Sequence, residues 1–327
     1  MTGSIRVVDR VAAAQLLADH DALLRLCRDI EESMLSVDEL RPRAEVVFGG
    51  VSTDLGQQQL YLTGLSPGST TLRLFPGPGT KSEQALCVRL DDKGRLRLVA
   101  ALDELNTLRT SVPTAIGVRH LAKPDARRVA VLGSGRQARS QTQLIRLLRP
   151  QLDQFRVWSP TTEHRQRFAA DVDEWPGVSC TSVESADQAV KDADVVVFAG
   201  TPAPAGSLTF GWADVAPAAV FTDIAFAVPP QLWAQARLVV PCSVRAIPTA
   251  FGFPNGWGPP FKVGVDPLAA LEPSALTDVI RGTASWHQSG GPVIFQIGGT
   301  YSWDDAFARW IEESAVERGL GQELDWP

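Results

Sequence analysis

The chain has 327 residues, of which 44% are apolar and 21% charged, so it can bury a large core and two domains are expected. Its 31 Lys and Arg against 37 Asp and Glu give a net charge of −6, the wrong sign for a protein whose main partner is nucleic acid. The 4 cysteines and 4 histidines show no metal-ligand spacing, which indicates free thiols of a reduced cytoplasm and no metal site. No apolar run is long enough to cross a membrane.

The first third of the chain predicts an α+β module. Leucines recur at near-helical spacing between Val11 and Met34, which indicates a helix. Short strand-like runs follow, broken by Gly, Pro and an Asp-Asp-Lys-Gly turn, and they cover residues 44–48, 59–62, 69–74, 84–89 and 95–100. We expect these runs to form an antiparallel sheet.

From Arg127 onward, strand and helix patterns alternate at short loop spacing, which is typical of a parallel sheet covered by helices. The run Asp194–Ala199 is almost unbroken in its apolar character, as expected for a strand with both faces covered. The expected strands are residues 128–132, 155–158, 178–182, 194–199, 219–224 and 238–241. The fold class is therefore α/β, with a Rossmann-type doubly wound parallel sheet beside the antiparallel module.

The last part of the chain lacks this rhythm. Residues 248–262 predict a long Pro/Gly/Trp-rich loop, residues 292–298 one more strand, and Trp303–Gly319 a helix. We assign this part back to the first module. The expected division is residues 1–122 with 288–327 as a dimerisation and substrate module, and 123–287 as the nucleotide-binding domain.

A glycine motif lies at the first strand-to-helix turn of this domain, where Gly133-Ser134-Gly135-Arg136-Gln137-Ala138 follows an apolar strand. In this context Gly133 allows a tight turn, Gly135 lets the backbone approach a pyrophosphate, and Ala138 permits close packing of helix on strand. The alternative is a glycine turn without a ligand. We expect a dinucleotide whose phosphates lie at the helix N-terminus.

The type of dinucleotide depends on the end of the second strand, where NAD-binding domains usually carry an acidic residue. Here Ser159 stands in a stretch without a carboxylate, which favours NADP over NAD. His164, Arg165 and Arg167 follow, and they either contact a 2′-phosphate or form a solvated helix face.

Several motifs resemble the ornithine cyclodeaminase/μ-crystallin family. They are the run from Leu108 to Gly117, His120-Leu-Ala-Lys-Pro124, the turn at Gly133 with Ser159, and Phe295-Gln-Ile-Gly298 followed by Asp304-Asp-Ala306. The resemblance implies a homodimer formed through the antiparallel module. It also implies a substrate cleft facing the nucleotide domain, and hydride exchange at an α-carbon that bears nitrogen, with NAD(H) or NADP(H).

The resemblance also implies site residues. Arg109 aligns with an arginine that clamps the substrate carboxylate, and Arg43 is a second candidate; the alternatives are an ion pair for Arg109 and an exposed surface position for Arg43. Thr110 and Thr201 are expected beside the dinucleotide. Asp304 resembles a position facing the cleft, or it is a helix N-terminal charge.

Two departures from the family pattern bear on the reaction. No lysine aligns with the substrate-clamping lysine of cyclodeaminases, because Thr70 stands there, with Arg73 or Lys81 as substitutes only if the loop is rearranged. The general-base position holds Ala225, and Asp223 lies two residues earlier, where it either points toward the cleft or caps the strand end. These departures argue against ornithine cyclodeamination.

We therefore expect a cytoplasmic NAD(P)-dependent oxidoreductase of specialised or amino-acid metabolism that acts on the C–N bond of an amino acid or its imine. The alternatives are a cyclodeaminase-like ammonia lyase and a non-catalytic NADP(H)-binding protein resembling μ-crystallin. No nucleic acid or membrane partner is expected.

Overall fold

The computed structural model describes residues 3–37, 44–53, 56–65, 70–76, 85–200, 208–224, 227–233, 235–241, 274–284, 291–297 and 303–326. Contacts divide the chain into two units, Met1–Arg109 with Tyr301–Pro327 and Thr110–Thr300. The boundaries expected from the sequence lie elsewhere, at 122/123 and 287/288. Among the described residues, no helix is long and apolar enough to cross a membrane.

The first unit is a seven-stranded sheet with the order β15-β1-β6-β5-β4-β3-β2. Its pairs are antiparallel, as expected from the turn chemistry, except that β1 and β6 are parallel. The strands are β1 (Gly3–Val8), β2 (Ala44–Thr53), β3 (Gly56–Leu65), β4 (Thr70–Pro76), β5 (Leu86–Leu90), β6 (Leu96–Ala101) and β15 (Gln322–Trp326).

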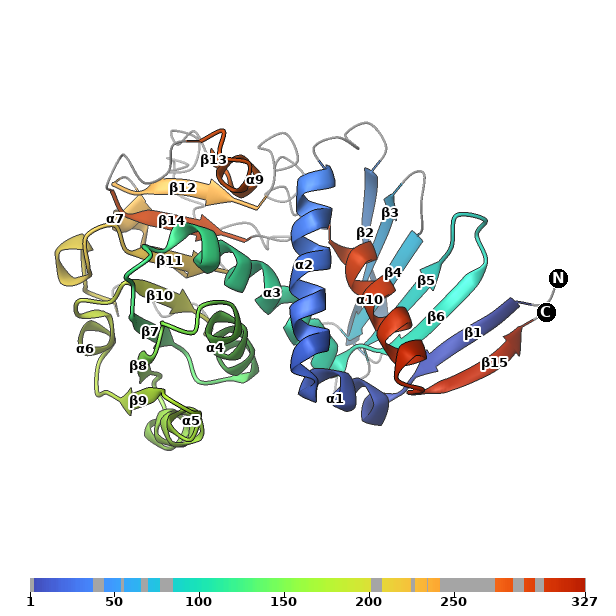
Figure 1. Ribbon diagram of the computed structural model, residues 1–327, viewed down its shortest axis with the longest axis horizontal. Coiled ribbons are helices and arrows are strands. Elements are labelled where there is room, and N and C mark those ends of the chain that lie inside the picture. Colours follow the sequence, from blue (N-terminus) through green and yellow to red (C-terminus); the bar gives the residue numbers. More distant parts are fainter. Residues whose placement is uncertain are drawn as a thin grey trace. The chain divides into compact units, whose positions relative to one another are not determined.

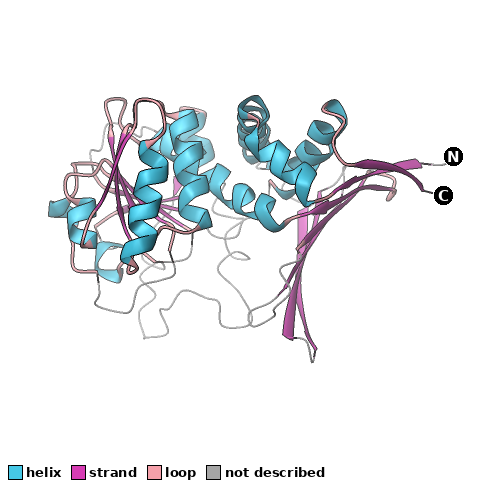
Figure 2. Cartoon of the chain, turned by 90° about the horizontal axis from the view of Figure 1, so that it is seen from below, coloured by secondary structure: helices cyan, strands magenta, loops and turns pink. Residues whose placement is uncertain are grey.

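The helices of this unit lie on one face of its curved sheet (Figures 1 and 2). The single helix expected over Val11–Met34 is two helices, because the Asp9 and Asp19 side chains accept backbone N–H bonds from Ala12 and Ala22 and so begin each one. These are α1 (Arg10–Ala18) and α2 (His20–Val37), and α10 (Asp304–Glu317) packs against α2.

The second unit is a doubly wound parallel sheet of eight strands with the order β13-β12-β14-β11-β10-β7-β8-β9 (Figure 1). The expected strands are all present, with small shifts at their ends. They are β7 (Arg128–Leu132), β8 (Gln154–Trp158), β9 (Ser179–Ser182), β10 (Val195–Phe198), β11 (Val220–Asp223) and β12 (Arg237–Val240), joined by β13 (Ser274–Ala275) and β14 (Val293–Gln296).

One assignment is wrong: β14 does not return to the first module. It pairs in parallel with both β11 and β12, so it belongs to the nucleotide-binding sheet. The order of elements along the chain gave no indication of this, because β14 inserts between two strands that precede it.

Helices cover both faces of the parallel sheet. On one face α6 (Ala186–Val190) and α7 (Pro230–Trp233) enclose a core in which the Phe198 and Phe221 rings lie 5.7 Å apart. On the other, α3 (Asp103–Leu121) approaches so closely that a Cβ at Gly117 would lie 2.2 Å from the Phe295 ring. The remaining helices are α4 (Arg136–Leu148), α5 (Thr162–Asp173), η1 (Trp212–Asp214) and α9 (Leu276–Ile280).

Candidate functional site

The turn between β7 and α4 has the geometry that the glycine motif predicts. Gly133 has φ +125°, and its N–H donates to the Trp158 carbonyl at 2.8 Å. A Cβ at this position would lie 2.8 Å from the Gly200 nitrogen. Any side chain there is therefore both strained and in collision with the end of β10, so the turn requires glycine.

Gly135 is different, because it opens onto free space. It is the N-cap of α4, no side chain caps the helix there, and a Cβ on Gly135 would meet nothing within 4 Å. Ala138, in the first turn of the helix, is fully buried against the sheet. The amino end of α4 thus presents backbone N–H groups and the positive end of the helix dipole to an open cradle, as a pyrophosphate site requires.

Several side chains around this cradle form hydrogen bonds or ion pairs with one another. Ser134 Oγ donates to Ser159 Oγ at 2.9 Å, which joins the ends of β7 and β8. Arg165 is 4% exposed, donates to the Ser159 carbonyl at 3.2 Å and pairs with Glu184. The Arg165 guanidinium is therefore held by the protein, and it stabilises the end of β8.

Of the other residues expected here, Arg136 is exposed in the first turn of α4, and Gln137 Oε1 accepts from Ser111 Oγ at 3.3 Å. Thr110 lies on α3, next to Arg109. Thr201 falls outside the described residues. His164 and Arg167 are exposed on α5.

Asp223 ends β11 and is fully buried. Its carboxylate oxygens accept from the Ala227 and Val228 backbone N–H groups at 3.0 and 3.1 Å. These bonds favour the alternative in which Asp223 caps the end of the strand and fixes the following loop.

In the first unit, two arginines converge on one carboxylate. Arg109 Nε lies 2.7 Å from Asp304 Oδ1, and Arg73 Nη2 lies 2.6 Å from Asp304 Oδ2. All three residues are buried, at 7%, 4% and 0% exposure. The Arg109 guanidinium also stacks 5.0 Å from the Trp303 ring centroid. Two guanidinium groups thus meet at one carboxylate.

Hydrogen-bond donors remain unused beside this cluster. Thr71 Oγ1 and Trp303 Nε1 are buried and make no hydrogen bond in the part of the chain that the structure describes. Thr71 and Arg73 alternate onto the same face of β4. Cys87, the cross-strand neighbour of Arg73, adds no charge at neutral pH, because burial raises the pKa of its thiol to about 12. Two guanidinium groups beside unused O–H and N–H donors are suited to an anion such as a carboxylate.

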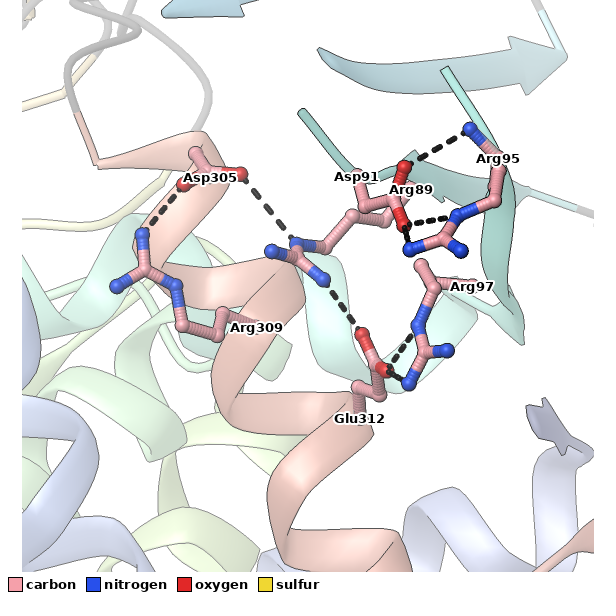
Figure 3. A network of polar contacts seen from close by, with 7 residues as sticks. All are labelled: Arg89, Asp91, Arg95, Arg97, Asp305, Arg309 and Glu312. Atoms are coloured by element: carbon pink, nitrogen blue, oxygen red, sulfur yellow. Dashed lines mark hydrogen bonds and ion pairs between the residues drawn. The ribbon is translucent and has the colours of Figure 1, made fainter. Parts of the chain in front are cut away.

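A second polar network fixes α10, which carries Asp304 (Figure 3). Arg89 on β5 lies 3.5 Å from Asp305 and 2.6 Å from Glu312, and Arg309 lies 2.7 Å from Asp305. Arg97 pairs with Glu312 at 3.1 Å. The contacts of Arg89 and Arg97 hold the first turn and the middle of α10 on the sheet and so set the position of Asp304.

The structure thus brings Arg109 and Asp304 together and adds Arg73 to them. From the sequence, Arg73 was expected to reach the site only if its loop were rearranged. Strand alternation was the available signal, since Arg73 lies on the same face of β4 as buried Thr71. Arg43 and Lys81 fall outside the described residues.

Comparison with known proteins agrees with this fold. The chain is 27% identical over 195 residues to Delta(1)-pyrroline-2-carboxylate reductase of Paracoccus denitrificans, a match that spans 57% of this chain and 60% of that protein. The structure of Thermococcus litoralis Delta(1)-pyrroline-2-carboxylate reductase in complex with NADH and L-proline superposes with a TM-score of 0.76 at 16% identity, covering 98% of this chain and 100% of that one. The iminosuccinate reductase of Paracoccus denitrificans in complex with NAD+ gives 0.75 at 18% identity, covering 99% and 100%.

The sequence model of the ornithine cyclodeaminase/mu-crystallin family matches residues 77–215, which include α3, the glycine turn and the first strands of the parallel sheet. The motifs that carry the resemblance between Leu108 and Ser159 lie inside this match. The chain is therefore similar to the ornithine cyclodeaminase/mu-crystallin family over residues 77–215, as its motifs predict.

Proposed function

We propose that this protein is an NAD(P)-dependent oxidoreductase that reduces the C=N bond of an imino acid to give an amino acid. The observation that carries the proposal is the open cradle at Gly135, which backbone N–H groups line and no side chain fills. The relatives support the class of reaction, because a protein named as a pyrroline-2-carboxylate reductase is similar in sequence, and solved pyrroline-2-carboxylate and iminosuccinate reductases share the fold.

The bound dinucleotide would supply a hydride to the carbon of the protonated C=N bond, whose π electrons move to the nitrogen to give the amine. Gly133, Gly135 and the first turn of α4 would hold its phosphates, and Ser134 with Ser159 would border its adenosine half at the end of β8. Residues 159–162, which follow β8, include no carboxylate that would repel a 2′-phosphate, so we propose that both NADH and NADPH bind.

The substrate carboxylate would bind to the cluster of Arg73, Arg109 and Asp304. Arg109 presents a planar fork to the carboxylate, while Asp304 orients both guanidinium groups. Thr71 and Trp303 would donate their unused O–H and N–H groups. Because this clamp binds through charge, it selects imines that carry a carboxylate next to the C=N bond.

We further propose a homodimer. Leu72, Leu74, Leu86, Val88 and Val99 lie on the sheet face opposite the helices, and cross-strand pairing joins Leu72 to Val88 and Val88 to Val99. Leu86 is 38% exposed and the others are half-buried. Such an aliphatic face is suited to a second copy of this chain. We place this dimer in the cytoplasm, where buried thiols such as Cys27 and Cys87 stay reduced.

The test is reduction of Δ1-pyrroline-2-carboxylate, followed by the loss of NADH or NADPH absorbance. We expect turnover of this imine and at least a hundredfold lower kcat/KM for Δ1-pyrroline, which lacks the carboxylate (a loss of about 2.7 kcal/mol). Conversion of ornithine to proline with release of ammonia at a comparable rate would instead support the cyclodeaminase alternative. Dinucleotide binding without turnover of any imine would support a binding protein.

Two glycine variants distinguish a loss of dinucleotide binding from a loss of stability. Gly135→Val should abolish dinucleotide binding in calorimetry at an unchanged melting temperature, since its side chain enters open space in extended backbone. Gly133→Val should lower the melting temperature as well, because it collides with the Gly200 backbone. A Gly135→Val protein that binds NADH as tightly as the wild type would refute the cradle.

A further inference from the structure

Gln296 is the last residue of β14, at the carboxyl edge of the parallel sheet. It is 1% exposed, so almost none of its surface faces solvent. Neither Nε2 nor Oε1 makes a hydrogen bond with any residue that the structure describes. A buried carboxamide without partners is costly, and such groups in a folded protein call for a specific explanation.

The neighbouring polar group does not satisfy Gln296. Asp223 is its partner in the register of β11 and β14, and residues in register project to the same face of the sheet. The Asp223 oxygens accept instead from the backbone N–H groups of Ala227 and Val228. The Gln296 carboxamide therefore lies beside the Asp223 carboxylate, whose position is fixed by backbone hydrogen bonds. Both polar atoms of the carboxamide remain without a hydrogen bond to the described residues.

The position of Gln296 in the sheet points to one end of a dinucleotide. Ligands of doubly wound sheets bind at the carboxyl ends of the strands, where the strand order reverses, here between β7 and β10. The adenosine half lies toward the second strand, β8, so the nicotinamide half lies toward β10, β11 and β14. From the turn after β7 to β14 is three strand spacings, or about 14 Å.

The hydrogen-bonding chemistry of the two unused atoms limits which group of a ligand can bind to Gln296. Nε2 needs an acceptor and Oε1 needs a donor, in one plane. A substrate carboxylate offers acceptors alone and would leave Oε1 unsatisfied. The carboxamide of nicotinamide offers one carbonyl and one NH2 group side by side, so it satisfies both atoms at once.

We propose that Gln296 binds the nicotinamide carboxamide, with Nε2 donating to its carbonyl and Oε1 accepting from its NH2 group. This inference rests on the dinucleotide binding of the proposed function. It makes Gln296 a positioning residue, because it would set the orientation of the ring from which hydride is transferred.

Calorimetry with two ligands tests this assignment. Gln296→Met keeps the length of the side chain and removes both polar atoms. It should weaken NADH binding about tenfold and leave the affinity for ADP-ribose, which lacks the nicotinamide ring, within about twofold of the wild type. The wild type should also bind the 3-acetylpyridine analogue, in which a methyl replaces the NH2 group, more weakly than NAD+, and Gln296→Met should bind the two equally.

The outcomes are distinct. Equal losses for NADH and ADP-ribose, or a lower melting temperature alone, would overturn the assignment in favour of a structural role. An unchanged affinity for NADH with a raised KM for the imine would overturn it in favour of a substrate contact. If the wild type bound neither NADH nor ADP-ribose, the proposed function itself would fail, whereas a failure confined to Gln296→Met leaves that function standing.

Discussion

Asp304 is the residue on which the cluster with Arg73 and Arg109 depends. Its carboxylate faces Arg73 and Arg109 at 2.6 and 2.7 Å with no exposure to solvent. A buried charge that loses its ion-pair partner destabilises the folded state, because its desolvation is no longer offset by the attraction to that partner. Asp304 therefore acts on stability and on the site together, since it neutralises one guanidinium and orients both.

Asp304→Ala should lower the free energy of unfolding by about 3–5 kcal/mol, because it leaves two buried guanidinium groups without their carboxylate. Arg73→Met should cost less, since Arg109 still neutralises Asp304. Urea unfolding of both variants measures the difference. Equal stability of Asp304→Ala and the wild type would mean that the carboxylate does not hold this cluster together.

The sequence predicted part of this cluster and missed the rest for a physical reason. Arg109 and Asp304 stand in motifs, so their identity was visible from the chain alone. Arg73 was named only as a substitute that needs a rearranged loop, because the family's lysine aligns with Thr70. In the structure no rearrangement is needed, since Arg73 lies on the buried face of β4, opposite Cys87 of β5. Gln296 lies within a recognised motif, but its lack of partners can be seen only when every neighbour is in place.

The helix α10 carries Asp304, and the network of Figure 3 fixes it to the sheet. Glu312 is 8% exposed and binds Arg89 and Arg97. We expect Glu312→Gln to lower the free energy of unfolding by about 1–3 kcal/mol, since it removes the charge that two arginines share. The matched control is Glu313→Gln at the next, exposed position, with a change within about 0.5 kcal/mol.

Chemical denaturation compares the two variants, and a loss at Glu313 as large as that at Glu312 would contradict the role given to the network. Because α10 is displaced when its anchor weakens, Glu312→Gln should also raise the KM for the imine. The KM is the more specific readout, since an effect on stability alone would leave it unchanged.

Local patterns predicted elements well and distant pairings poorly. All six expected strands of the parallel sheet are present, since each is a short apolar run between turn residues. By contrast β1 pairs with β15 across almost the whole chain, Gly3 with Trp326, and neither strand was expected. The place of β14 was wrong for the same reason: no local pattern records which strand a segment will pair with.

The whole molecule is expected to be a dimer, and Leu86 is the position at which to test it. This leucine is the most exposed of the five aliphatic residues on the open sheet face, so a charge there costs folding little. Leu86→Glu should convert a dimer of twice 35.3 kDa to the monomer in light scattering, because two copies of the face would bury unpaired carboxylates.

Val11→Glu, at a residue 69% exposed on α1, adds the same charge elsewhere and should leave the dimer intact. A wild-type monomer at micromolar concentration, or equal dissociation of both variants, would show that this face is not the interface.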